Sequence, residues 1–194
     1  MALENWFATP LYVHDFDGDI LKSVQAELDA KMPAIRAAAT EQAQGGTIKS
    51  TFKYGKGFTD DIATFELNTF RKEINYVAHQ YMLSLKHHGN PLKLEGSWTM
   101  FYSKGASHFD HAHPFCRVSG CYYYASNGQD GNIRFQNPNL LIHAGLFPAD
   151  GIPVESLSYA PKVGRVILFP SWLMHRVEMN NTNSERISIA FNFV

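Results

Sequence analysis

The sequence predicts an α+β protein that is mainly β, with supporting helices in its first part and a core of strands in the rest. In residues 19–39 and 61–86 the apolar side chains recur with a period close to that of an α-helix. After Pro91 the period falls to that of strands, and the segments become short and rich in β-branched and aromatic residues. Such segments at intervals of about ten residues are typical of β-sandwiches and β-barrels.

The length, net charge and apolar runs of the whole chain limit the number of domains, the partners and the localisation that can be expected. A length of 194 residues predicts one domain over residues 1–194, with residues 1–91 as mostly helical support and residues 92–194 as the core. A formal net charge of −1 gives no electrostatic argument for a nucleic-acid or membrane partner. Because no apolar run could cross a bilayer and "MALENWFATP" lacks a signal-peptide pattern, we expect a cytoplasmic protein with two free thiols, Cys116 and Cys121.

Two helices are expected in the first part. The first covers residues 19–39, and Pro33 should break or kink it. Its apolar stripe consists of Ile20, Val24, Leu28, Met32 and Ile35. The second runs from about Asp61 to Lys86, ends before Gly89, and has a stripe of Phe70, Ile74, Val77, Ala78, Tyr81 and Leu85. These helices should either buttress the β core or form the interface of a homodimer.

The expected strands are, in chain order, "LKLEGSWTMFYS", "RVSGCYYYAS", "GNIRF", "NLLIHA", "VESLSY", "GRVILF", "WLMHRVEM" and "ERISIAFNF". In the last strand, one face is fully apolar and should pack under the helices; it consists of Ile187, Ile189, Phe191 and Phe193. The other face carries Arg186, Ser188, Ala190 and Asn192. This second face is either exposed to solvent or the interior of a barrel that binds an anion, a role that suits the guanidinium fork.

The stretch "HFDHAH", residues 108–113, contains residue types that bind metals. Two pairs are available: His108 with Asp110, and His111 with His113. On a regular strand the two pairs point to opposite faces, so at most one of them can line a given pocket. His175 is a single later histidine on another expected strand. From these residues alone, the choice of pair and the presence of a metal stay open.

Five segments in chain order carry a family resemblance: "YSKGASHFDHAHP", "SGCYYY", "GNIRFQNP", "PKVGRVILFPSWLMHRV" and "RISIAFNF". Together they resemble the 2-oxoglutarate/Fe(II)-dependent oxygenases, in particular small bacterial and phage members that are prolyl-4-hydroxylase-like. The resemblance covers roughly residues 98–194. It implies a double-stranded β-helix, or jelly-roll, as the catalytic core, with Fe(II) as cofactor and 2-oxoglutarate as co-substrate.

The resemblance also implies a set of metal ligands. Counted from Tyr102, the family's first motif places Gly105 three residues on and the first metal histidine nine residues on, at His111. The second ligand then falls on His113, and the third is His175. His113 departs from the aspartate or glutamate that is usual there, and His108 with Asp110 is the runner-up pair. Asp110 could otherwise accept a hydrogen bond from a ligand imidazole.

For 2-oxoglutarate, the resemblance implies Arg186 as the partner of the distal carboxylate, helped by Ser188, Tyr123 and Tyr102. The implied reaction uses O₂, releases succinate and CO₂, and hydroxylates an unidentified substrate, with no catalytic residue beyond the metal ligands. Two alternatives stay open. One is a three-histidine, cupin-like dioxygenase that uses no 2-oxoglutarate, and the other is a jelly-roll binding module without enzymatic activity.

Overall fold

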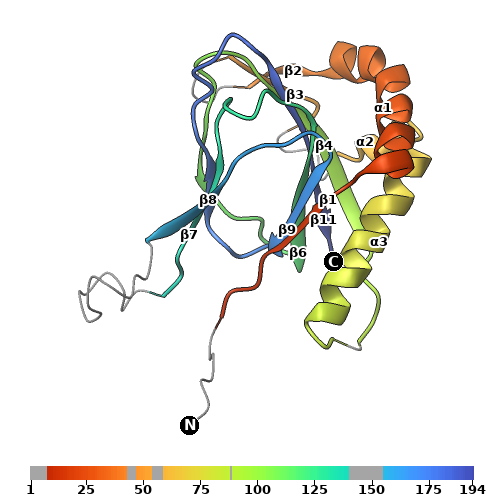
Figure 1. The fold of residues 1–194 in the computed structure, drawn as a ribbon, viewed down its shortest axis with the longest axis vertical. Helices are drawn as coiled ribbons and strands as arrows, with labels where there is room; N and C mark the ends of the chain where they lie inside the picture. The colour runs from red at the N-terminus through yellow and green to blue at the C-terminus, as the bar shows by residue number, and fades with distance from the viewer. Residues whose placement is uncertain (1–7, 43–46, 54–58, 88, 140–154) are drawn as a thin grey trace.

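The computed structural model describes residues 8–42, 47–53, 59–87, 89–139 and 155–194. These residues form three layers: a small sheet, a large sheet and a layer of helices, which Figure 1 shows from one side. The predicted class, α+β and mainly β with helices before a β core, is confirmed.

The large sheet has seven strands and the small sheet has four, and every pair of neighbouring strands is antiparallel. In spatial order the large sheet consists of β1 (Tyr12–Asp15), β9 (Arg165–Pro170), β6 (Val118–Ala125), β11 (Arg186–Phe193), β4 (Leu94–Tyr102), β3 (Ile48–Ser50) and β2 (Thr40–Gln42). The small sheet consists of β5 (His108–His111), β10 (His175–Val177), β7 (Ile133–Gln136) and β8 (Ser156–Tyr159). Two facing antiparallel sheets are the arrangement expected of a jelly-roll.

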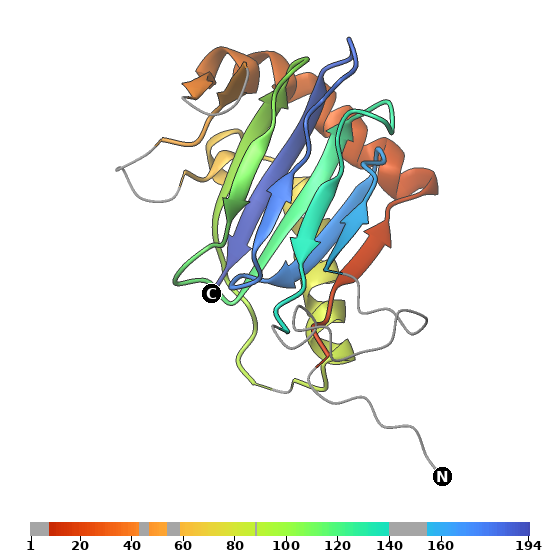
Figure 2. The same ribbon diagram turned by 90° about the vertical axis from the view of Figure 1, so that its left-hand side faces the viewer.

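Three helices, α1 (Gly18–Ala38), α2 (Asp61–Thr64) and α3 (Asn68–Ser84), cover the side of the large sheet that faces away from the small sheet (Figure 2). The main core fills the space between the helices and the large sheet. It joins the stripes of α1 and α3 to the apolar face of β11, which consists of Ile187, Ile189, Phe191 and Phe193. The prediction that this face packs under the helices is therefore confirmed.

A second core lies between the two sheets and consists of Tyr123, Ile133, Phe135, Ile167, Phe169 and Leu173. Its presence leaves the remaining space between the sheets for polar side chains from β5, β10 and β11. Arg186, Ser188 and Asn192 are all buried there, so the second face of the last strand is an interior and not a solvated surface.

The helix predictions need two corrections. The break or kink predicted at Pro33 is not a break, because the helix α1 is continuous through this residue. Val24, Leu28, Met32 and Ile35 are buried on both sides of the proline, and this packing outweighs the lost backbone hydrogen bond. Ile20, the first residue of the expected stripe, is exposed.

The second expected helix is in fact two helices, because the chain turns between α2 and α3. Glu66 adopts a left-handed φ of 55° in that turn. The turn lets Ile62 and Leu67 both reach the main core, where each has no exposed surface. Phe70, Ile74, Val77, Ala78 and Tyr81 are buried as predicted, whereas Leu85 is exposed.

Three strands of the first part, β1, β2 and β3, were not predicted, and each is only three or four residues long. Most of the predicted strand "NLLIHA" lies outside the described residues. None of the described helices combines the length and the apolar character that crossing a membrane requires.

Candidate metal centre

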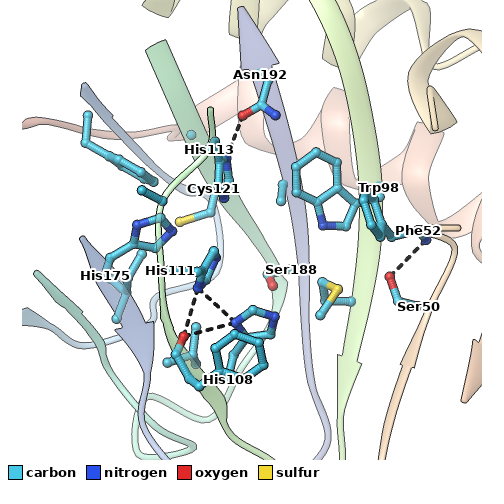
Figure 3. A pocket seen from close by; sticks show the side chains of 18 of the residues that line it. Ser50, Phe52, Trp98, His108, His111, His113, Cys121, His175, Ser188 and Asn192 are labelled. Atoms are coloured by element: carbon cyan, nitrogen blue, oxygen red, sulfur yellow. Dashed lines mark hydrogen bonds between the residues drawn. The ribbon is translucent and has the colours of Figure 1, made fainter. Parts of the chain in front are cut away.

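Three histidines meet between the two sheets: His111 at the end of β5, His113 just after it, and His175 at the start of β10. Antiparallel pairing sets His111 directly opposite His175, and the backbone N–H of His113 donates to the carbonyl of Ser171 at 2.8 Å. One ring nitrogen from each histidine lies within 4.8 Å of the other two. Figure 3 shows the three rings pointing toward one another, so this group could hold a metal ion.

Each of the three rings has an oxygen atom at its Nδ1. The partner is Oδ1 of Asn192 for His113 at 2.7 Å, the carbonyl of Phe109 for His111 at 2.8 Å, and the carbonyl of Leu173 for His175 at 2.9 Å. These oxygens can only accept, so each Nδ1 must carry the proton that it donates. The lone pair of each imidazole then lies on Nε2, which is the state that a metal ligand needs.

Burial keeps these imidazoles neutral. It lowers the pKa of His113 to about 4 and that of His175 to about 2, and it lowers the pKa of His111 from its usual value. The neighbouring imidazoles add to the lowering at His113 and His175, because one positive charge disfavours another nearby. At neutral pH the three imidazoles are therefore uncharged, and each could offer the lone pair of its Nε2 to a metal ion.

The two members of the runner-up pair, His108 and Asp110, lie in different surroundings, and only His108 lines the pocket. His108 lines the same pocket as His111, and the Nδ1 atoms of these two residues lie 3.0 Å apart. Burial lowers the pKa of His108 to about 4. Asp110 does not line the pocket, and its Oδ2 lies 3.5 Å from Nη1 of Arg176. The expected role of Asp110 as acceptor for a ligand imidazole has no support in the described hydrogen bonds, since the three Nδ1 atoms have other partners.

Only one complete pair, His111 and His113, lines the pocket, but the expectation that the two pairs point to opposite faces is wrong for His108. It assumed strict alternation along β5, but the pairing with β10 is irregular there. His111 pairs with His175 and His108 pairs with Val177, so three steps along β5 match two steps along β10. An extra residue in one strand of a pair is a β-bulge, and it brings His108 and His111 to the same face.

Arg186 lies at another part of the same pocket and is 1% exposed. Its Nη1 donates to the carbonyls of Asp130 at 2.8 Å and Gly131 at 2.6 Å, and its guanidinium lies 4.0 Å above the ring of Tyr102. Its Nη2 is buried and has no hydrogen-bond partner among the described residues. Leaving such a charged donor unpaired is costly, so the geometry fits an anion bound beside it.

Ser188 and Tyr123, which the resemblance assigned to the same anion, face each other on β11 and β6 and line the pocket with Tyr102. The pocket has a volume of about 430 Å³. It therefore holds every residue predicted to bind metal or 2-oxoglutarate, apart from Asp110 of the runner-up pair.

The sequence did not predict the residues that hold His113 in place. The sequence assigned Asn192 no role beyond its place on the polar face of the last strand, and its Oδ1 contacts the ring of His113. Ser119 donates to Oδ1 of Asn192 at 2.7 Å and lies 2.8 Å from the hydroxyl of Ser171. Both serines have no exposed surface. Buried serines, such as Ser119 on β6 and Ser171 in the turn after β9, carry no signal in one sequence, although the polar Asn192 on the inner face of β11 could have suggested a partner.

Comparisons with known proteins agree with the class that the fold and pocket define, a double-stranded β-helix with a candidate metal centre. Residues 96–192, half of the chain, match the family model described as "Putative 2OG-Fe(II) oxygenase", and the chain belongs to this family. No curated protein matches the sequence significantly.

Solved structures share the fold at low sequence identity. A prolyl-4-hydroxylase from Pseudomonas putida matches with a TM-score of 0.59 and 16% identity, over 95% of this chain and 92% of that one. A 2OG-Fe(II) oxygenase family protein from Burkholderia pseudomallei matches with a TM-score of 0.61 and 12% identity, over 93% of each chain. The epimerase SnoN from nogalamycin biosynthesis matches with a TM-score of 0.65 and 15% identity, over 96% of this chain and 78% of that one. SnoN has also been solved with Fe³⁺ and α-ketoglutarate.

Proposed function

We propose that this protein is an Fe(II)- and 2-oxoglutarate-dependent oxygenase that hydroxylates a substrate, with release of succinate and CO₂. His111, His113 and His175 hold the iron through their Nε2 atoms. Arg186 and Ser188 bind the distal carboxylate of 2-oxoglutarate, and Tyr123 and Tyr102 form the walls beside it. We further propose that residues 1–194 act as one domain, with the helices as support or as a homodimer interface.

The observation that carries this proposal is the unpaired Nη2 of Arg186 in the pocket that also contains the three imidazoles. A buried guanidinium nitrogen that lacks a partner favours a carboxylate as its acceptor, because hydrogen bonds between charged groups are the strong ones. A dicarboxylate can meet that edge with one end while its keto-acid end reaches the metal. The fold match to SnoN, which was solved with Fe³⁺ and α-ketoglutarate, supports the same pair of ligands.

When iron and 2-oxoglutarate are bound, their reaction with O₂ oxidises 2-oxoglutarate to succinate and CO₂ and supplies the oxidising power that hydroxylates a substrate C–H bond. The protein's own part is to fix geometry. Asn192 and the carbonyls of Phe109 and Leu173 orient the three imidazoles. The carbonyls of Asp130 and Gly131 hold Arg186, which in turn orients the co-substrate.

The three-histidine set differs from the usual two histidines and one carboxylate. Three neutral imidazoles leave the full +2 charge of the ion uncompensated, which should weaken metal binding and favour an anionic co-substrate. The same set would also suit a cupin-like dioxygenase that uses no 2-oxoglutarate. That alternative gives no role to the unpaired, buried edge of Arg186, so we favour the 2-oxoglutarate enzyme.

Anaerobic calorimetric titration of 2-oxoglutarate into the Fe(II)-loaded protein tests the proposal, followed by admission of air and quantification of succinate. We expect about one equivalent of 2-oxoglutarate to bind and succinate to form slowly without a substrate. Arg186→Met should weaken 2-oxoglutarate binding at least about tenfold while iron stays bound. If the wild type binds iron but neither binds 2-oxoglutarate nor forms succinate, the proposal is wrong.

A further inference from the structure

Four aromatic side chains line the pocket: Phe52 after β3, Trp98 on β4, Phe109 on β5 and Phe115 after β5. We name these four residues the aromatic mouth. Phe52 and Trp98 form a ring pair with centroids 5.2 Å apart, and Phe109 is stacked on His108 at 5.0 Å. Figure 3 shows Trp98 and Phe52 on the opposite side of Ser188 from the three metal-site histidines.

Two of these rings are unusually exposed. Phe115 is 94% exposed and Phe109 is 59% exposed, although both line the pocket. Phe115 also adopts a left-handed φ of 67°, which is rare for a bulky residue. The exposed apolar ring and the left-handed backbone each destabilise the folded protein. Backbone strain of this kind is typical of ligand-binding positions. The ring would be covered if a flat apolar ligand lay against it.

The polar groups near the mouth are already engaged by the protein. The Ser50 hydroxyl donates to the carbonyl of Thr99 and accepts from the N–H of Phe52, both at 3.0 Å. The Gln42 amide donates to the carbonyls of Thr40 and Phe52, both at 3.3 Å. Among the described lining residues, Arg186 is the one with a permanent charge, and the proposed function assigns it to the co-substrate. A cationic substrate would therefore lose its hydration without gaining an anionic partner among the described lining residues.

We propose that the aromatic mouth binds the substrate of this oxygenase and that the substrate is an uncharged, planar aromatic small molecule. The proposal rests on the proposed function, which makes the pocket an oxygenase site. The volume of about 430 Å³ lies toward the lower end of small-molecule sites, and 2-oxoglutarate occupies part of it. The remaining space fits a molecule of one to three fused rings. Stacking on Trp98 and Phe115 gives such a molecule most of its contact area.

Binding of the uncharged fluorescent naphthalene PRODAN to chelator-treated, metal-free protein tests the proposal independently of iron and 2-oxoglutarate. We expect saturable binding of one equivalent with a blue-shifted emission. Trp98→Ala and Phe115→Ser should each weaken it at least about tenfold. The matched controls are Trp172→Ala and Met179→Ser, because both residues are exposed and neither lines the pocket. Both controls should bind PRODAN like the wild type.

Competition against PRODAN distinguishes the chemistry of the ligand. We expect 2-naphthol to displace the probe, and naphthylmethylammonium, with the same ring system and a positive charge, to be at least about tenfold weaker. Equal or stronger displacement by the ammonium compound, or by a proline-containing tetrapeptide amide, would overturn the proposal. So would the absence of saturable binding, or unchanged binding in Phe115→Ser, a variant whose exposed side chain is not needed for folding. PRODAN binding is measured without iron and 2-oxoglutarate, so a failure of this proposal is distinguishable from a failure of the proposed function.

Discussion

Nδ1 of His113 lies 2.7 Å from Oδ1 of Asn192, and this contact ties the segment after β5 to the last strand of the large sheet. The same Oδ1 accepts from the Ser119 hydroxyl at 2.7 Å, so the amide is itself held in place. A candidate metal ligand that follows the last residue of β5 in the small sheet is thus held by a residue of the large sheet.

Loss of this contact should weaken metal binding. We expect Asn192→Leu to lower the affinity for Fe(II) by about tenfold, because Nδ1 of His113 loses its shorter contact and keeps only the Ser119 hydroxyl at 2.9 Å. Asn192→Asp keeps an acceptor and should retain most of the affinity. Competition with a chromophoric chelator under anaerobic conditions measures both. Equal affinity in wild type and Asn192→Leu would show that Asn192 does not position His113.

The binding of 2-oxoglutarate should depend on Gly131, which does not need to touch it. A Cβ at Gly131 would lie 2.2 Å from the carbonyl oxygen of Glu178 and 2.9 Å from Nη1 of Arg186. We expect Gly131→Ala to shift Arg186 and to weaken 2-oxoglutarate binding at least about tenfold, or about 1.4 kcal/mol.

Gly128→Ala is the matched control for this change. Gly128 also has a left-handed φ, of 81°, but its nearest neighbour to a Cβ is the carbonyl oxygen of Pro161 at 3.8 Å. Both variants pay the backbone cost of a left-handed alanine, and only Gly131→Ala disturbs the guanidinium. Calorimetric titration of 2-oxoglutarate into both metal-loaded variants separates the shared backbone cost from the displacement of Arg186. Equal losses of 2-oxoglutarate affinity in Gly131→Ala and Gly128→Ala would contradict the role given to Arg186.

The stability of the fold should depend on Asp61, which connects α2 to the strands. Its Oδ2 accepts from the hydroxyls of Thr51 and Thr99, both at 2.7 Å, and the residue is 1% exposed. We expect Asp61→Ala to lower the free energy of unfolding by about 2–4 kcal/mol, because two buried hydroxyls lose their acceptor. Asp19→Ala removes a 99% exposed carboxylate and should cause no measurable change. Urea unfolding compares the two, and a small loss in Asp61→Ala would count against the network.

The metal-free protein should become less stable as the pH falls from about 7 to about 5. In the folded state the pKa is about 4 for His108 and His113 and about 2 for His175, whereas an unfolded histidine titrates near 6.5. Below about pH 6.5 the unfolded chain therefore binds more protons, so acidification favours unfolding, by about 2 kcal/mol for each such imidazole over this range.

Two carboxylates act differently. The pKa of Asp15 is held at about 2 by Arg165 and Lys162. Its stabilisation of the fold is present above about pH 4 and is lost only as the pH falls below that value, so it adds nothing to the change between pH 7 and pH 5. Asp61, whose pKa is raised by burial, contributes in the opposite direction. Urea unfolding with a chelator at pH 7, 6 and 5 measures the sum, and His175→Gln should flatten the slope. Stability that stays level or rises on acidification would contradict this account.

Much of the fold could be predicted because it follows from local patterns. The alternation in "RISIAFNF" predicted that its apolar residues pack under the helices and left its polar face open between solvent and an interior, and the helical stripes together with this apolar face identified most of the main core. Pro33 failed as a signal because packing on both sides of it overrides a local backbone preference. The strands β1 to β3 are too short to show an alternating pattern.

The site could be predicted only as far as its residue types and their order. The grouping of His111, His113 and His175 followed the family resemblance, whereas the approach of His108 depends on a bulge in the pairing of β5 with β10. A bulge shifts the face of a side chain without changing the sequence pattern. The buried serines and the free edge of Arg186 likewise arise from contacts between strands far apart in the sequence.

An anaerobic titration with Fe(II) and 2-oxoglutarate, followed through the visible charge-transfer band of the chelate, tests the central claim most directly. The claim is that His111, His113 and His175 hold the iron while 2-oxoglutarate binds at the metal. The account predicts a band in the wild type and in Asp110→Ala, and no band in His113→Ala. A band that persists in His113→Ala and is lost in Asp110→Ala would contradict it and assign the ligand to the carboxylate.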